Sequence, residues 1–118
     1  MKFSVNQQDL QKSLNYCQGV IEKRSTLPIL SNVLLEVSNA NLTITATDLD
    51  LIFIHKIPNV EISEEGKTTS SSSIMYDIVR KFSSGSKINF SNPSENKLHL
   101  ESEKSVFNLN CINASEFP

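Results

Sequence analysis

One feature constrains the fold of this chain more than any other: a fixed order of strand-like runs and amphipathic helices that occurs twice. One alternating run, one helical stripe and three further alternating runs fill the first half, and the second half repeats that order. Corresponding runs lie 54 to 56 residues apart, as Val33 lies from Lys87 and Leu42 from Leu98. Identity between the halves is negligible, so the repeat is one of pattern. It predicts an α+β fold, a duplicated βαβββ unit with two helices packed on antiparallel sheets.

The first half begins with a short strand and a helix. Residues 2–5 alternate, with Phe3 and Val5 on one side. Asn6 is suited to cap the helix that follows, and Gly19 to end it. The apolar stripe of that helix recurs at helical spacing, with Leu10, Leu14, Cys17 and Ile21. The opposite face is polar and nearly uncharged, with Gln8, Gln11, Lys12 and Asn15.

The second helix follows a run of serines, residues 70–73, that offers N-caps, and Gly85 is expected to end it. Its apolar stripe consists of Met75, Ile78, Val79 and Phe82. Asp77, Arg80 and Lys81 face away, and Asp77 and Lys81 are spaced for an i,i+4 ion pair. Further strands are predicted at residues 32–37, 42–47, 51–57, 60–62, 68–73, 87–91, 97–101 and 105–111. Both helices should therefore cover the sheets from one side and present their polar faces outward.

Size and hydropathy place the chain among folded proteins outside the membrane. Its 118 residues suit a single domain, and 38% hydrophobic with 20% charged residues is enough for a core. The longest apolar run is four residues, 51–54, whereas a membrane helix needs roughly 20. The first residues lead into no signal-peptide core. We expect a soluble, cytoplasmic protein without a membrane partner.

Nothing in the chain is arranged for catalysis or for a cofactor. Cys17 and Cys111 lie far apart without metal-ligand spacing, so two buried, reduced thiols are expected, with no metal site. Asp48 and Asp50 lie at a turn, where aspartate commonly accepts from local backbone amides. His55, like His99, stands alone in a strand pattern. A small hydrolase using Asp48, Asp50 and His55 is a remaining alternative, but we predict that the chain is not an enzyme.

Five segments, in register along the whole chain, carry a family resemblance. They are Met1-Lys2-Phe3, Thr26-Leu27-Pro28-Ile29-Leu30-Ser31-Asn32, Thr47-Asp48-Leu49-Asp50, Tyr76-Asp77-Ile78 and Phe117-Pro118. Together they resemble the first domain of the bacterial sliding clamps, the beta subunit of DNA polymerase III, with one extra residue in the turn at 92–96. The resemblance implies that residues 1–118 are the first of three clamp domains of a longer protein.

The resemblance also implies a function and partners. In that family two protomers close head to tail into a homodimer ring around double-stranded DNA. The ring is a non-enzymatic processivity factor in DNA replication that tethers the replicative polymerase, and a separate clamp loader consumes ATP. The polymerase and the loader are expected to bind mainly through the later domains, which are absent here. The alternative is a protein-interaction module of the same α+β class without a DNA role.

A formal net charge of −2 argues against an ordinary, strongly basic DNA-binding protein. A clamp, however, needs only mild positive potential on the face that lines its hole, because strong phosphate contacts would impede sliding. The expected DNA-binding residues are Lys12, Lys23, Arg24, Arg80 and Lys81, with Arg24 the clearest by resemblance; the alternative for each is a solvated surface cation. An acidic outer surface is expected from Glu61, Glu64, Glu65, Glu101 and Glu103. Related clamps often carry basic residues just before the second helix, where this chain has Ser72, Ser73 and Ile74. We therefore expect weaker DNA contact there.

The last predicted strand contains the expected dimer interface. Phe107 and Leu109 share one face of that strand, and a place in the domain core is one interpretation. The resemblance implies another, in which this is an edge strand that pairs with the third domain of the neighbouring protomer. Lys97 and Lys104 would then supply the basic part of the interface.

Overall fold

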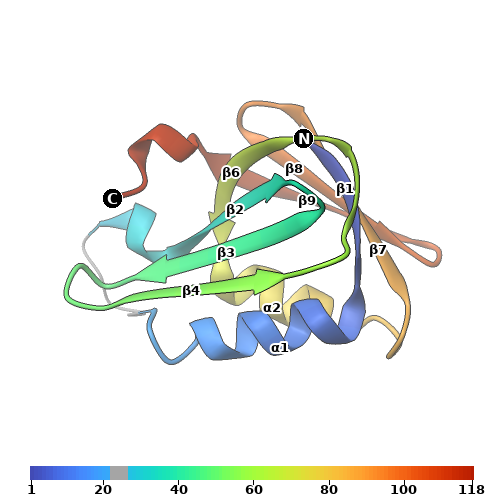
Figure 1. The fold of residues 1–118 in the computed structure, drawn as a ribbon, viewed down its shortest axis with the longest axis horizontal. Helices are drawn as coiled ribbons and strands as arrows, with labels where there is room; N and C mark the ends of the chain where they lie inside the picture. Colours follow the sequence, from blue (N-terminus) through green and yellow to red (C-terminus); the bar gives the residue numbers. More distant parts are fainter. Residues whose placement is uncertain (22–26) are drawn as a thin grey trace.

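The computed structural model describes residues 1–21 and 27–118 (Figure 1). Its described part contains two α-helices, α1 (Gln7–Cys17) and α2 (Ser72–Val79), and two short 3-10 helices, η1 (Pro28–Ser31) and η2 (Ala114–Glu116). The strands are β1 (Lys2–Asn6), β2 (Asn32–Ser38), β3 (Asn41–Thr47), β4 (Ile52–Ile57), β5 (Glu61–Glu64), β6 (Gly66–Ser71), β7 (Lys87–Ser94), β8 (Lys97–Ser102) and β9 (Ser105–Ile112). The predicted α+β class is confirmed.

The sheet interlocks the two repeats. Its strand order is β4-β3-β2-β6-β9-β8-β7-β1-β5, and the neighbouring strands pair antiparallel. The first unit is β1-α1-β2-β3-β4 and the second is β6-α2-β7-β8-β9, with the short β5 between them. Strand β1 leaves its own unit to pair with β7, and β6 likewise pairs with β2. Each unit thus completes the sheet of the other, and the stacked rings of Phe3 and Phe90, 4.7 Å between centroids, lie across one of these exchanged pairs.

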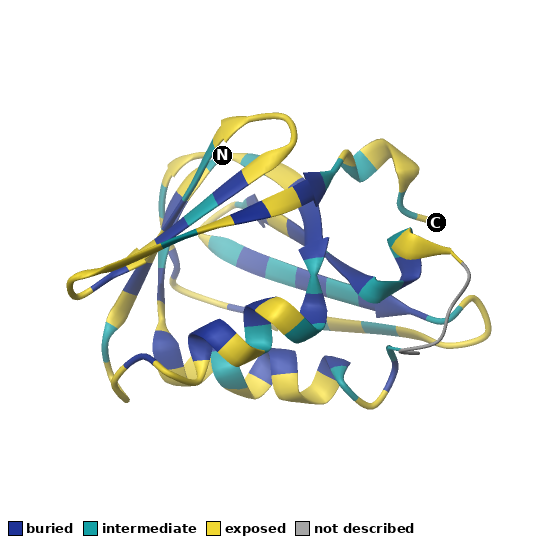
Figure 2. Cartoon of the chain, turned by 180° about the vertical axis from the view of Figure 1, so that it is seen from behind, coloured by how far each residue is buried: buried dark blue, intermediate teal, exposed yellow. Residues whose placement is uncertain are grey.

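Both helices lie side by side against the same face of the sheet (Figure 1). The sides of the helices that face the strands are buried, and the sides that face away are exposed (Figure 2). Leu10 and Leu14 of α1 and Met75 and Val79 of α2 are completely buried in the core beneath this layer. Burying a side chain of that size is worth about 1.5–3 kcal/mol, so the apolar stripes hold the helices in place and leave their polar faces outward, as predicted.

The predicted N-caps form at both helices. The Asn6 side-chain oxygen accepts from the backbone N–H groups of Gln8, at 2.9 Å, and Asp9, at 3.3 Å. In α2 the Ser71 hydroxyl oxygen accepts from the N–H of Ile74 at 3.3 Å. These bonds satisfy amides that have no carbonyl partner within the helix.

The predicted end of α2 is wrong by six residues. That helix ends at Val79 and not at Gly85, because Lys81 and Phe82 bond to carbonyls three residues back, at 3.1 and 3.2 Å, instead of four. This tighter turn still buries Phe82 in the core. Gly85 lies beyond it in a loop, at a φ of +82°. Helix α1 ends at Cys17 with Gln18 as its C-cap, so Gly19 follows directly, at the predicted stop.

The shorter α2 also changes its ion pair. Asp77 does not pair with Lys81, because the chain leaves α-helical spacing before that residue. Instead Asp77 Oδ1 lies 3.3 Å from Arg80 Nη2, an i,i+3 pair.

The two cysteines are free and buried, as predicted. Burial raises the pKa of the Cys17 thiol to about 12 and also raises the pKa of the Cys111 thiol. Because the thiolate is the reactive form, neither residue is poised for nucleophilic chemistry. Neither helix of the described residues has the length and apolar content to span a membrane.

We predict that Asn6→Ala lowers the free energy of unfolding by about 1 kcal/mol, because two amides of the first turn of α1 lose their acceptor. Urea denaturation monitored by circular dichroism measures the change. Asn15→Ala, on the exposed face of the same helix, is the matched control and should be neutral or slightly stabilising, since alanine is the better helix former. Equal losses in the two variants would contradict a capping role for Asn6.

Candidate nucleic-acid interface

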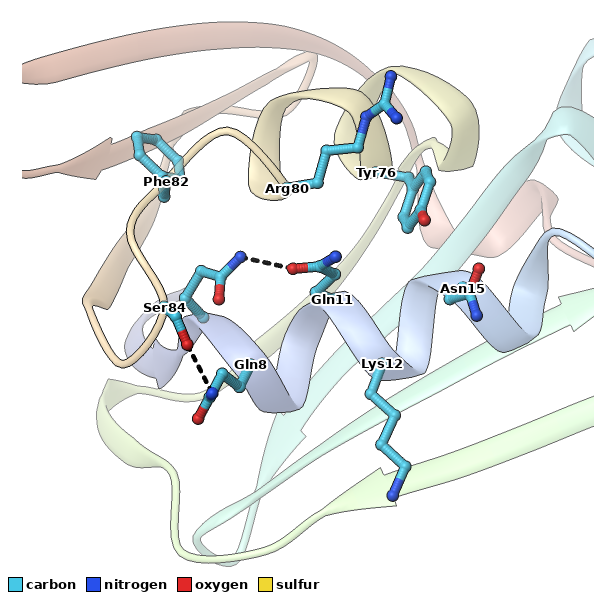
Figure 3. A pocket seen from close by; sticks show the side chains of 9 residues that line it. Gln8, Gln11, Lys12, Asn15, Tyr76, Arg80, Phe82 and Ser84 are labelled. Atoms are coloured by element: carbon cyan, nitrogen blue, oxygen red, sulfur yellow. Dashed lines mark hydrogen bonds between the residues drawn. The ribbon is translucent and has the colours of Figure 1, made fainter.

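A groove of about 520 Å³ runs between α1 and α2 on the face away from the sheet (Figure 3). We call it the helix groove. It is lined by Gln7, Gln8, Gln11, Lys12, Asn15, Tyr76, Arg80, Phe82 and Ser84. Among these lining residues, amides are the most frequent and carboxylates are absent. The groove is therefore polar, with positive charge only.

Helical spacing explains which side chains reach the groove. Residues 8, 11, 12 and 15 of α1 recur at intervals of three and four, opposite the buried stripe. Of these, Gln11 is half-buried and the others are exposed. Tyr76 and Arg80 lie four residues apart at the C-terminal end of α2. The polar face predicted for α1 is thus one wall of the groove, and α2 supplies the other.

A small amide network holds the two walls together. Gln7 Nε2 donates to the Val79 carbonyl of α2 at 2.9 Å and to Gln11 Oε1 at 2.7 Å. Gln8 Nε2 donates to Ser84 Oγ at 2.5 Å, on the loop after α2 (Figure 3). The Val79 carbonyl, at the end of α2, therefore accepts from the Phe82 N–H of its own tight turn, at 3.2 Å, and also from α1.

Sequence reasoning missed the role of Gln7. The residue is buried, and a signal for this existed: Gln7 lies three residues before Leu10 and seven before Leu14, on the apolar stripe of α1. A polar residue on that stripe needs a hydrogen-bond partner in the core. The sequence does not reveal that this partner belongs to the other helix.

The structure brings together two of the five cations predicted to contact DNA. Lys12 and Arg80 line the groove from different helices and extend away from each other, so they stand on opposite rims (Figure 3). Lys81 is exposed just beyond the end of α2 and does not line the groove. The predictions for Lys23 and Arg24 lie outside the described residues.

The acidic residues expected on the outside lie apart from the groove and are exposed. Glu61 pairs with Lys87 at 2.8 Å, and Glu64 pairs with the N-terminal amine at 3.0 Å. Glu103 accepts from the Ser83 N–H at 3.1 Å, and its hydrogen bonds with Ser83 lower the pKa of the carboxyl. These glutamates therefore lie away from the helix groove.

Ser72, Ser73 and Ile74 lie within the first turn of α2 rather than before it. Ser72 is buried, and its hydroxyl has no hydrogen-bond partner among the described residues. Ile74 is 51% exposed, so an aliphatic side chain stands on the surface at this end of α2. The start of α2 therefore contributes no positive charge in this chain.

The residues of the hydrolase alternative have structural partners. Asp48 Oδ1 accepts from the N–H groups of Asp50 and Leu51, at 2.9 and 2.7 Å, which confirms the predicted turn. His55 Nδ1 lies 3.0 Å from the buried Ser13 hydroxyl of α1. His99 Nδ1 lies 2.9 Å from Asn108 Oδ1 on the neighbouring strand. Within residues 1–21 and 27–118, no three His, Cys, Asp or Glu side chains gather as metal ligands would.

The interface residues expected on the last strand lie on β9 and beside it. Leu109 belongs to the core at 8% exposure, and the half-buried Phe107 packs edge to face on Phe82, 5.8 Å between ring centroids. Lys97 Nζ donates to Asn110 Oδ1 at 2.7 Å, and Lys104 is exposed in the turn between β8 and β9. The apolar pair thus contributes to this domain's own core.

The prediction that the last strand is an edge strand is wrong for its C-terminal end. Cys111 and Ile112 pair with Ser70 and Thr69 of β6, and Ser70 Oγ donates to the Asn110 carbonyl at 2.8 Å. Residues 105–110 have ladder partners on β8 alone in the described part of the chain. The free edge is therefore the N-terminal stretch of β9, where Val106 is 51% exposed.

We predict that Gln7→Met lowers the free energy of unfolding by about 0.5–1.5 kcal/mol, because the buried hydrogen bond from α1 to the Val79 carbonyl is lost and that carbonyl keeps only the Phe82 N–H. Urea denaturation of the purified chain measures this change. Gln8→Met is the matched control, since it removes the bond from an exposed amide on the same helix and should change stability by less than about 0.5 kcal/mol. A Gln7 variant as stable as the Gln8 variant would show that the bond between the helices contributes nothing.

Comparison with known proteins connects this geometry to a family. The sequence model of the DNA polymerase III beta subunit, N-terminal domain, matches residues 1–118. The beta sliding clamps of Caulobacter vibrioides and Escherichia coli K12 are 35% and 36% identical to the chain, over 119 and 118 residues. These alignments cover 100% of this chain and 32% of each relative, so the chain spans about a third of their length.

Solved structures of sliding clamps show the same fold as this chain. A pol III beta structure from Caulobacter crescentus superposes with a TM-score of 0.94 at 36% identity, covering 100% of this chain and 31% of that one. A sliding clamp from Bartonella birtlesii gives 0.94 at 36% identity, covering 100% and 33%. The likeness extends over the whole chain, including both helices of the groove.

Proposed function

This chain belongs to the family of the DNA polymerase III beta subunit, N-terminal domain, and from that premise we propose that it is the first of three domains of a DNA sliding clamp. The clamp is a ring-forming processivity factor that encircles double-stranded DNA during replication. One observation carries the proposal to this chain's own residues: the outward face of its helix layer is a polar groove with Lys12 and Arg80 on its rims and no acidic lining residue. The interaction-module alternative has no support in the comparisons.

The weak charge of the helix groove suits sliding. Each phosphate that a protein neutralises adds salt-dependent affinity, with a slope of about 0.9 per phosphate on duplex DNA. Gln8 and Gln11 already form hydrogen bonds within the groove, so they can face the DNA backbone without binding its phosphates strongly. Contacts from a few cations, the exposed Lys12, Arg80 and Lys81 together with Lys23 and Arg24, position the duplex without selecting sequence. Topology, rather than affinity, keeps the ring on DNA.

The chemistry of such a protein is tethering, and its side chains carry out no reaction. Encircling DNA raises the effective concentration of a bound polymerase at the primer end. The proposed partners are double-stranded DNA, a second protomer, the replicative polymerase and a clamp loader, the last two mainly through the later domains. Since the bacterial chromosome lies in the cytoplasm, the proposal places the protein there.

We predict that the natural full-length protein, loaded with its clamp loader and ATP, stays on nicked circular DNA and runs off when the circle is linearised. Retention before and after cutting, measured by gel filtration of the DNA, tests the topological link. Equal retention on both forms would indicate ordinary binding, and no retention with a loader that is active on a control clamp would favour an interaction module. Either result would overturn the proposal.

We also propose that the free stretch of β9 pairs with the neighbouring protomer, with Phe107 and Leu109 as the apolar part of the interface and Lys97 and Lys104 as the basic part. The exposed Val106 and the unpaired edge at residues 105–110 support this role, since an open edge in the described sheet is otherwise a liability.

Phe107→Ala combined with Leu109→Ala should convert the full-length dimer to a monomer in sedimentation at micromolar concentration. Because both residues also pack in the core, Leu42→Ala on β3 is the control: Leu42 is completely buried and β3 pairs with β2 and β4, so its loss destabilises the domain without touching β9. An unchanged mass in the double variant, or dissociation of the control as well, would contradict the proposed interface.

A further inference from the structure

The guanidinium of Arg80 is engaged within its own helix turn. Asp77 Oδ1 lies 3.3 Å from Arg80 Nη2, and the Arg80 Cζ lies 5.7 Å from the centroid of the Tyr76 ring. Both partners of the ion pair are exposed, Arg80 at 53% and Asp77 at 57% of the side chain. A phosphate that approaches Arg80 must therefore compete with a carboxylate that is already in place.

Lys12, on the opposite rim, also has an acid one turn before it. Asp9 and Lys12 line one hollow of about 390 Å³ on the other side of α1, together with His55 and Lys56. The sequences Asp9-Leu10-Gln11-Lys12 and Asp77-Ile78-Val79-Arg80 therefore share an acid three residues before a groove cation. In α2 the acid contacts its cation directly.

We propose that Asp77 is a positioning residue that attenuates the DNA contact of Arg80, keeping that contact weak enough for sliding; this inference rests on the proposed clamp function. An exposed ion pair is weak and exchanges readily with solvent and with other anions. Arg80 can therefore reach a phosphate, but only by giving up Asp77, and it returns to Asp77 when the DNA moves on. The ring of Tyr76 keeps the guanidinium at the groove during this exchange.

The attenuation has a measurable signature in the salt dependence of binding. A cation that neutralises a phosphate fully adds about 0.9 to the slope of log affinity against log salt. While Asp77 competes, Arg80 adds less than that amount. Removing the carboxylate should therefore raise affinity and steepen the slope together, which a merely structural role would not do.

The test uses the full-length protein and a short linear duplex, with affinity measured by fluorescence anisotropy across a range of salt. Asp77→Asn should bind about two- to fivefold more tightly at low salt, the range set by the energy of an exposed ion pair, and should steepen the salt slope by up to about 0.9. Glu95→Gln makes the same charge change in the turn between β7 and β8 and should alter neither quantity. An Asp77→Asn variant that matches the wild type would overturn the inference.

Arg80→Ala separates action through Arg80 from a general charge effect. On its own it should weaken binding, and Asp77→Asn should have no effect in the Arg80→Ala background. If Asp77→Asn strengthens binding equally in both backgrounds, Asp77 does not act through Arg80 and the inference fails. The clamp function fails separately, by loss of retention on circular DNA in the wild-type protein, so the two failures are distinguishable.

Discussion

The exchange of first strands between the two repeats is the constraint on which the rest of the structure depends. Because β1 pairs with β7 and β6 pairs with β2, neither unit has a complete sheet without the other. Each helix follows directly after an exchanged strand, α1 after β1 and α2 after β6. Both helices therefore lie on the same face of the sheet. The helix groove exists because the two helices lie side by side there.

The helix layer separates two physical tasks. Its inner side buries apolar side chains and supplies stability, and its outer side carries amides and a few cations. The link from Gln7 to the Val79 carbonyl joins the walls with neutral groups, so holding the helices together adds no charge to the surface. The described glutamates lie elsewhere on the domain. A net charge of −2 is therefore compatible with a mildly positive face, because distribution matters more than the sum.

Most elements could be predicted because they depend on local signals. The alternating runs became strands close to their expected bounds, and Asn6 and Ser71 became caps, since period and capping chemistry lie within a few residues of each other. The end of α2 could not be predicted in this way. Phe82 continues the apolar spacing of the helix, but it enters the core through a tighter turn. As a consequence, Asp77 pairs with Arg80 and not with Lys81. The pairing of the end of β9 with β6 could not be predicted either, since strand order depends on contacts between residues far apart in the sequence.

The sequence by itself determined the α+β class, the duplicated unit, the polar outer faces of both helices and the family. The signals for these features, which are periodicity, capping residues and motif register, depend on residues that lie close together in the sequence. Only the tertiary structure decided which strands exchange, that Lys12 and Arg80 stand on opposite rims of one groove, and that Gln7 reaches the other helix. These features depend on contacts between residues as far apart as Gln7 and Val79. Such contacts form only when burial of the shared core brings the two repeats together.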